Sequence, residues 1–172
     1  MLSYNYYLLF AGIKINNSTC NLQVVRKIFY LYQMTKQKRR SDCPINFALE
    51  VFGDKWTFLI VRDLMFKGKH YYGEFLNSEE KIATNILADR LSLLEQEGIV
   101  LKNIDTSHGS KFIYKLSQKG IDLLPVLTEV IMWSAKYDKH TAADAKFVSR
   151  VRKNREGFLK EITSRLNKEL KD

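Results

Sequence analysis

The chain has 172 residues, an ordinary apolar content and a formal net charge of +9, which suits one domain with extensions and favours an anionic partner such as nucleic acid or a membrane surface. Its two cysteines rule out a disulfide framework, and no Cys/His spacing resembles a zinc site. The longest early apolar run, residues 6–13, is too short for a bilayer and follows no basic segment, so we expect a cytoplasmic protein without a membrane partner, metal or cofactor.

The first 41 residues differ in character from the rest of the chain. Residues 1–33 are rich in Tyr, Asn, Ile and Leu and have no clear period, whereas residues 34–41 form a basic, polar arm. We therefore interpret Met34 as the natural start and residues 1–33 as translated upstream sequence; the alternative is an apolar extension that packs on the domain. The arm either follows a DNA backbone or minor groove or acts as a solubilising tail, and its basic side chains are Lys36, Lys38, Arg39 and Arg40.

Two helices are predicted next. Pro44 suits the first turn of a helix that carries apolar side chains over residues 45–52 and ends at Gly53. Asp54 can cap a second helix over residues 55–65, which is largely apolar.

Short elements then lead to a longer helix. Residues 70–72 are extended enough for a very short strand, residues 73–77 predict one or two helical turns, and residues 78–81 form a polar link. Short helix, tight link and further helix, in this order, are typical of a helix-turn-helix.

The helix after this link begins near Thr84, which is placed to help cap its start, and ends at Gly98, which can take a left-handed turn. Leu87, Leu91 and Leu94 recur at i, i+4 and i+7 and share one apolar side. The opposite side carries short polar groups that suit the DNA major groove, namely Asn85, Asp89, Ser92 and Gln96. The alternative is a plain amphipathic surface helix.

A β-hairpin is predicted directly after Gly98. Residues 99–104 and 112–116 read as strands, and the polar turn between them contains Gly109, which is free to adopt a positive φ. A hairpin in this position is typical of the wing of a winged helix; a bare structural ribbon is the alternative.

The C-terminal third of the chain predicts further helices. Ser117 can cap a long helix running to about Tyr137, and the basic tail over residues 141–172 is helix-prone but interrupted by Gly157. The apolar stripe of the long helix is wider than one small domain needs, which favours a subunit interface over simple core packing. Its members are Ile121, Leu123, Leu124, Val126, Leu127, Val130, Ile131, Met132 and Trp133.

An ordered set of motifs runs through the chain from Asp42 to Tyr137. Its members are Cys43-Pro44, Gly53-Asp54-Lys55-Trp56-Thr57, Tyr72-Gly73-Glu74-Phe75, Ile82 to Leu94, Glu97-Gly98-Ile99-Val100, Tyr114-Lys115-Leu116-Ser117, Lys119-Gly120, and Leu124-Pro125-Val126-Leu127 before Trp133. Together they resemble the HxlR-type winged helix-turn-helix regulators, which are relatives of the MarR type. Ala83 departs from the pattern, because many members have a capping Ser there.

The resemblance implies a mainly α fold with a small β-hairpin (α+β), that is, a winged helix-turn-helix with N- and C-terminal dimerisation helices. It implies a bacterial or archaeal transcription factor, not an enzyme, that binds double-stranded operator DNA as a homodimer. The expected division is an extension and arm over residues 1–41, the HxlR-type domain over 42–138, and a basic helical tail over 139–172.

Candidate DNA contacts follow from this placement. Asn85 can pair bidentately with adenine, and Ala88 can meet a thymine methyl group. Asp89 can accept a hydrogen bond from cytosine, orient Arg90 or repel phosphate. Arg90 suits a phosphate contact and an internal ion pair equally well. The predicted base contacts also include Thr84, and the predicted phosphate or minor-groove contacts, with a solvated loop as the alternative, are Lys81, His108, Ser110 and Lys111.

Cys43 is the one residue with candidate chemistry of its own. It precedes Pro44 at a predicted helix N-terminus and follows the basic arm, and both features favour a reactive thiolate. In some members of the resembled family a cysteine at this place senses electrophiles or oxidants. The alternative is an inert residue packed near the dimer interface, with regulation left to an unidentified small effector.

Two other functions compete with transcriptional regulation. An enzyme is disfavoured, because the sequence has no nucleophile–base set, metal cluster or Gly-rich phosphate loop. A winged-helix module that binds protein and not DNA is favoured by the net charge of −2 over residues 43–138, since the basic residues gather in the flanks. Salt dependence separates these functions, because phosphate contacts weaken steeply as salt rises.

Overall fold

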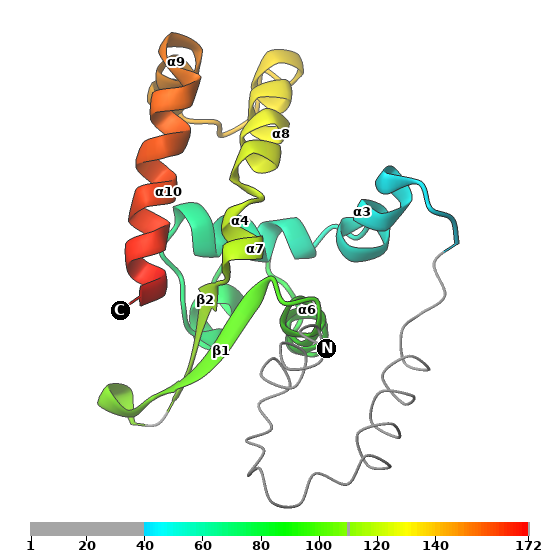
Figure 1. Cartoon of the computed structure of the whole chain (residues 1–172), viewed down its shortest axis with the longest axis vertical. Coiled ribbons are helices and arrows are strands. Elements are labelled where there is room, and N and C mark those ends of the chain that lie inside the picture. Colours follow the sequence, from blue (N-terminus) through cyan, green and yellow to red (C-terminus); the bar gives the residue numbers. More distant parts are fainter. Residues whose placement is uncertain (1–39, 110, 172) are drawn as a thin grey trace, which may run out of the picture. The chain divides into compact units, whose positions relative to one another are not determined.

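The structure, a computed structural model, describes residues 40–109 and 111–171. A compact unit begins at Asp42 (Figure 1). The predictions for residues 1–33, for Ser110 and for most of the basic arm lie outside the described residues, and the division of the chain into three parts stays a prediction.

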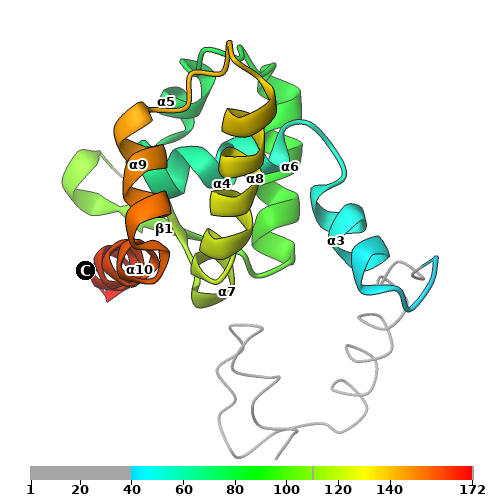
Figure 2. The ribbon, with the colours of Figure 1, turned by 90° about the horizontal axis from the view of Figure 1, so that it is seen from above.

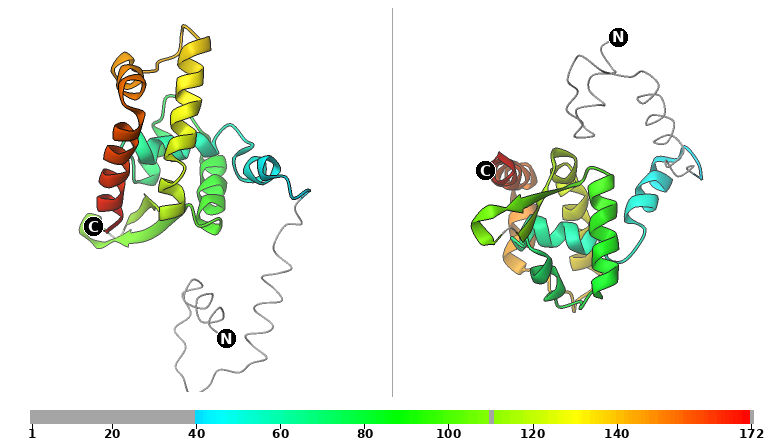
Figure 3. Two further views of the ribbon diagram at one scale, coloured as in Figure 1. Left: turned by 45° about the horizontal axis from the view of Figure 1, so that its top comes forward. Right: turned by 90° about the horizontal axis from the view of Figure 1, so that it is seen from below.

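The unit is mainly helical, with one two-stranded antiparallel sheet, which confirms the predicted fold class. In chain order its elements are α3 (Pro44–Phe52), α4 (Thr57–Phe66), α5 (Tyr72–Leu76), α6 (Thr84–Gln96), β1 (Val100–Asp105), the 3-10 turn η1 (Thr106–His108), β2 (Lys111–Leu116), α7 (Gln118–Ile121), α8 (Leu124–Tyr137), α9 (Ala145–Lys153) and α10 (Arg155–Lys171). Helix α6 and the hairpin share one side of the unit (Figures 1 and 3), while α3 stands at its edge (Figure 2).

The hairpin runs from the pair Val100–Leu116 beside the core to the pair Asp105–Lys111 near its tip. The strand predicted over residues 70–72 is reduced to a single bridge between Tyr71 and Ile113. A helix forms here in place of a longer strand, because the carboxylate of Glu74 accepts a hydrogen bond from the backbone N–H of Tyr71 at 2.8 Å and so caps the start of α5.

A continuous hydrophobic core joins α4, α5, α6, the base of the hairpin, α7 and α8. Its largest fully buried apolar side chains are Val61, Leu64, Met65, Phe75, Leu87, Leu94, Ile99, Val100, Ile121 and Leu124. The leucine stripe of α6 therefore faces the core as predicted. Helix α3 is attached at one end, where the ring of Phe52 stacks on Phe58 with centroids 4.7 Å apart.

The prediction of one long helix after Ser117 is wrong in one respect, because the structure has two helices there, α7 and α8. Ser117 does cap the first piece by accepting the N–H of Gly120 at 3.1 Å. The break at Asp122–Leu123 follows from Pro125, whose missing N–H and rigid ring suit the first turn of a new helix and not the middle of a long one.

The basic tail folds back onto the core as two helices. Its interruption lies at Asn154 and not at Gly157, because Asn154 ends α9 and its side-chain oxygen accepts the N–H of Gly157, inside α10, at 2.9 Å. The tail is anchored by Arg165, which donates to the backbone oxygen of Met65. Its buried apolar side chains, which join the same core as the winged-helix elements, are Val151, Phe158, Ile162 and Leu166.

Candidate nucleic-acid interface

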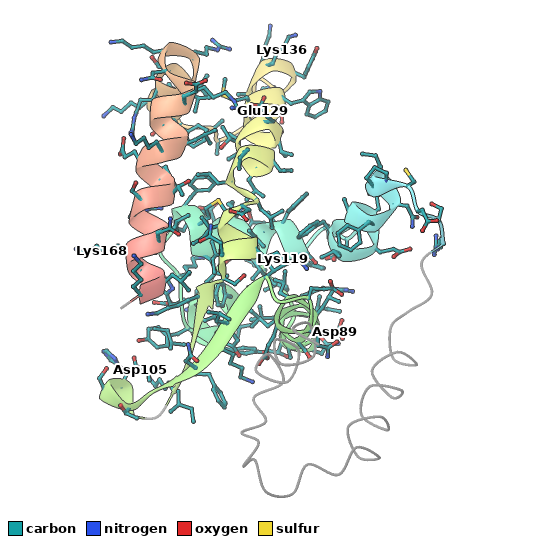
Figure 4. The ribbon with its side chains drawn as sticks, viewed as in Figure 1. Asp89, Asp105, Lys119, Glu129, Lys136 and Lys168 are labelled. Carbon is teal, nitrogen blue, oxygen red and sulfur yellow. The ribbon has the colours of Figure 1, made fainter. Side chains whose placement is uncertain are left out.

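The two sides of α6 differ sharply in exposure. Leu87, Leu91 and Leu94 are buried, and Gly98 ends the helix region with a φ of +66°, as the sequence predicts. The opposite side is exposed along its whole length, with Thr84, Asn85, Ala88, Asp89 (labelled in Figure 4), Ser92 and Gln96. The proposed base-contacting residues therefore lie together on one exposed side of the helix. Their side chains are short, so this side of the helix can approach base edges closely.

The start of α6 differs from the prediction. Thr84 is the first helical residue and not the cap; Ala83 holds the capping position, and no side chain caps the helix. Since Ala83 has no side-chain oxygen, the first-turn N–H groups of α6 stay open to an external acceptor such as phosphate. The start is held instead by Tyr72 of α5, whose hydroxyl donates to the backbone oxygen of Thr84 at 2.6 Å.

Arg90 faces carboxylates, which favours the internal ion pair over the phosphate contact. Its Nε lies 3.6 Å from Asp54 and its Nη2 lies 3.7 Å from Asp89. Burial would raise the pKa of Asp54, but hydrogen bonds from Thr57 and from backbone N–H groups, together with the charge of Arg90, lower it overall. Asp54 also bonds the N–H groups of Trp56 and Thr57, so α4 begins at Thr57, two residues later than predicted.

A polar cluster beneath the helix-turn-helix was not predicted. Asp63 of α4 is only 2% exposed and accepts hydrogen bonds from Ser78 at 2.5 Å, from Lys69 at 3.0 Å and from Arg62 at 2.6 Å. Arg62 in turn bonds Glu80 at 2.5 Å. We call these residues the Asp63 cluster; they tie α4 to both turns that flank α5 and so fix where α6 begins.

The Asp63 cluster gives the unit a defined pH dependence. The hydrogen bond that the Glu80 carboxylate accepts from Arg62 lowers the pKa of Glu80 from 4.5 to about 2. A carboxylate whose pKa is lowered in the folded protein stabilises the fold at pH values above its pKa in the unfolded chain. This stabilisation is lost as the pH falls from 4.5 to about 2. The difference in the free energy of unfolding between the wild type and Glu80→Gln should therefore be constant above pH 4.5 and shrink toward zero near pH 2.

Urea unfolding across this pH range measures that difference. Glu79→Gln is the matched control, because Glu79 is the exposed neighbour and has no ion pair among the described residues. A wild-type advantage over Glu80→Gln that persists unchanged at the acid end would contradict this account of the pair.

The hairpin tip is fixed by a second cluster around Asp105 (Figure 4). Its carboxylate accepts hydrogen bonds from Ser107 at 2.5 Å and from the Tyr71 hydroxyl at 2.6 Å, and it lies 2.8 Å from Nδ1 of His108. These hydrogen bonds hold the pKa of Asp105 well below its usual range, and the one from Ser107 has the largest effect. The predicted contacts His108 and Lys111 are exposed beside this ordered tip.

Further contacts join the start of α7 to the end of α6. At the end of α6, Ser117 and Lys119 (Figure 4) donate to the backbone oxygens of Gly98 and Glu97, both at 2.6 Å. Lys81, the other predicted phosphate contact, is exposed at the opposite end of the helix, in the left-handed region with φ +52°. The proposed contact residues that the structure describes are therefore brought to α6, its leading turn and the adjoining wing.

Two helices leave apolar side chains exposed. On α8 these are Val126, Val130, Trp133 and Tyr137, spaced i, i+4, i+7 and i+11 along one side, and on α3 they are Ile45 and Leu49. Trp133 is 65% exposed and lies against Tyr137, with ring centroids 5.4 Å apart. We call the four α8 residues the α8 stripe; a contiguous exposed apolar surface of this kind is typical of a protein–protein interface.

Cys43 is exposed at the position that precedes α3, with Pro44 as the first helical residue. Of the basic side chains of the arm, Arg40 alone lies in the described part of the chain, and it is exposed. Within residues 40–109 and 111–171 there is no group of His, Cys, Asp and Glu side chains suited to hold a metal ion. No helix among the same residues is long and apolar enough to cross a membrane.

Comparison with known proteins identifies relatives of this arrangement. A family model described as HxlR-like helix-turn-helix matches residues 51–142, slightly more than half of the chain. The HTH-type transcriptional regulator YodB of Bacillus subtilis (strain 168) is 32% identical over 96 residues, covering 55% of this chain and 85% of YodB. The uncharacterized HTH-type regulator YdeP of the same organism is 30% identical over 97 residues, covering 56% of this chain and 75% of YdeP.

Solved structures agree with these relatives. The crystal structure of PA1607 is 36% identical with a TM-score of 0.54, covering 62% of this chain and 72% of that chain. The redox regulator HypR in its oxidized form is 30% identical with a TM-score of 0.50, covering 55% of this chain and 96% of HypR. The family match ends at residue 142, so α9 and α10 lie outside it.

Proposed function

Because this chain belongs to the HxlR-like helix-turn-helix family of transcriptional regulators, we propose that it works in the cytoplasm as a homodimer that binds a pseudo-palindromic operator. Family members are DNA-binding regulators and not enzymes. The observation that carries the proposal is the open side of α6, where short polar groups stand in line beside an ordered wing. Such a surface fits the major groove, and the wing then meets the adjacent backbone or minor groove.

The α8 stripe supports the homodimer. Its four apolar side chains repeat along one side of the helix, and α3 also leaves Ile45 and Leu49 exposed. A two-fold dimer uses the same surface of both subunits, so a self-complementary apolar stripe is well suited to it. Two copies of α6 would then lie about one DNA turn apart, roughly 34 Å, on two half-sites of opposite orientation.

Within this proposal, Asn85 reads a base and Lys111 contacts a phosphate. Asn85→Ala should relax sequence preference at one base pair, with a loss of about 1–3 kcal/mol for the preferred operator and little for unrelated DNA. Lys111→Ala should weaken every sequence alike and reduce the slope of log affinity against log salt by about one unit. Fluorescence anisotropy with operator and scrambled duplexes at several salt concentrations measures both effects.

The two variants control each other, since both shorten an exposed side chain of the same surface. If both lost affinity in the same sequence-independent way, the division into base contact and phosphate contact would be wrong. Binding that is insensitive to salt in the wild type would instead favour a module that binds protein.

We assign a regulatory role to Cys43 within the same proposal. It is exposed at the start of α3, and α3 carries part of the apolar surface proposed for the dimer. The similarity to HypR, described as a redox regulator, supports this role. Oxidation or alkylation of the sulfur would change the contacts of α3, and with them the spacing of the two α6 helices and the affinity for the operator.

The test uses a Cys20→Ser background, so that Cys43 carries the single thiol. Operator affinity should fall after mild diamide or quinone treatment and recover with dithiothreitol. The same treatment should leave the Cys43→Ser variant unchanged. Equal affinity before and after treatment of the thiol-containing protein would show that Cys43 is only a packing residue.

A further inference from the structure

A hollow of about 640 Å³ lies between the C-terminal end of α8 and one side of α9. This volume falls within the usual range for sites that bind small molecules, about 300–1,000 Å³. The segment over residues 138–144, which connects the two helices, contributes Asp138, Lys139, Thr141 and Ala143 to its lining. It stands at the opposite end of α8 from α6 and the wing (Figure 1), so the proposed DNA surface does not account for it.

The charges around the hollow are strongly unbalanced. It is lined by three cations, Lys139, Arg152 and Lys153, and by one acid, Asp138. The carboxylate of Asp138 accepts the N–H of His140 at 2.9 Å, and its charge leaves the lining with a net charge of +2, three cations less one acid. A concave site lined by one sign of charge raises the local concentration of ions of the opposite sign.

Two neighbouring arginines differ from the cations that line the hollow. Arg150 bonds Glu161 at 2.7 Å, and Arg155 bonds Glu129 on α8 at 2.7 Å (Figure 4). Arg150 and Arg155, which lie outside the lining, thus each have a carboxylate partner. For the three cations that line it, no carboxylate lies within ion-pair distance in the described part of the chain.

The rest of the lining is small and largely apolar. It comes from Ala135, Ala143, Ala145 and Val148, with the hydroxyl groups of Thr141 and Ser149 among them. A free inorganic ion would leave this part of the hollow unused, whereas an apolar group attached to the anion would cover it. Binding pockets for small molecules typically combine such an apolar lining with a few polar groups that fix orientation.

We propose that this hollow binds a small organic anion, with a carboxylate or phosphate group held by Arg152, Lys153 and Lys139 and a flat apolar body resting on the alanine and valine side chains. Helix α9, which supplies Arg152 and Lys153, lies outside the segment that matches the family, whereas Lys139 and the end of α8 lie within it. The proposal does not depend on DNA binding.

Isothermal titration calorimetry of the full chain with 2-naphthoate and 2-naphthyl phosphate tests it, with 2-naphthol as the neutral probe of the same shape. Both anions should bind saturably at up to millimolar concentration and at least about tenfold more tightly than 2-naphthol. Their affinity should weaken as salt is added, because the cations are exposed. The double variant Arg152→Gln/Lys153→Gln should lose at least about tenfold in affinity for both anions.

The matched control is Lys160→Gln/Lys168→Gln, which removes the same charge from exposed positions of α10 (Lys168 is labelled in Figure 4). It should bind both anions like the wild type, and circular dichroism should show all three proteins equally folded. The proposal is overturned if neither anion binds saturably, if 2-naphthol binds as tightly as the anions, or if the two double variants behave alike.

Discussion

Replacing Trp133 with glutamate is expected to convert the protein from a dimer to a monomer and to abolish tight operator binding. Trp133 is the most exposed large side chain of the α8 stripe, and a buried aromatic anchor of an interface typically contributes about 2 kcal/mol or more. A two-fold interface contains the residue twice, so the dimer loses about 4 kcal/mol, which raises its dissociation constant about a thousandfold. Sedimentation equilibrium measures this change.

Ile104→Glu is the control, because Ile104 on the hairpin is an exposed apolar residue of similar exposure, 60% against 65% for Trp133. It introduces the same charge and should leave the protein dimeric. The melting temperature of Trp133→Glu should be at least that of the wild-type monomer obtained by dilution, since the Trp133 side chain is not part of the core. A dimer that survives Trp133→Glu at micromolar concentration would contradict the proposed interface.

Asp63→Ala is expected to cause the largest loss of stability among single changes outside the apolar core. The carboxylate is 2% exposed and is shared by Arg62, Lys69 and Ser78. Removal of one partner from a buried charge network costs about 3–5 kcal/mol. We expect about 3 kcal/mol, because Arg62 keeps Glu80 and because Arg62 and Lys69 are partly exposed.

Urea unfolding at neutral pH gives the free energy, and operator affinity gives the functional effect. Since the Asp63 cluster fixes the turn that leads into α6, affinity should fall even under conditions where the variant is folded. Asp122→Ala, at an exposed carboxylate, should change the free energy of unfolding by no more than about 0.5 kcal/mol. A similarly small effect of Asp63→Ala would show that the cluster does not support the helix-turn-helix.

The parts of the fold that follow from local pattern could be predicted from the sequence. The leucines of α6 repeat with a helical period, and the change to strand-like residues after Gly98 marks the hairpin. The exposed side of α6 follows from the same period. Family membership, too, could be inferred from short motifs in a fixed order.

Features that depend on distant contacts could not be predicted. Asp63 and Ser78 are 15 residues apart, and Arg62 and Glu80 are 18 apart, so nothing in the local sequence pairs them. The apolar side of the tail was visible in the sequence, but an amphipathic helix pairs equally well with a second subunit or with its own core. The break before α8 had a local signal in Pro125, which the long apolar stripe concealed.

Selection of bound duplexes from a pool of random DNA tests most directly the central claim, that this chain is a sequence-specific, dimeric DNA-binding regulator. We expect enrichment of one sequence with two half-sites of opposite orientation, their centres about 10 base pairs apart. Binding to that sequence should weaken steeply with added salt. A pool that stays as random as it began, or bound DNA that is indifferent to salt, would contradict the claim.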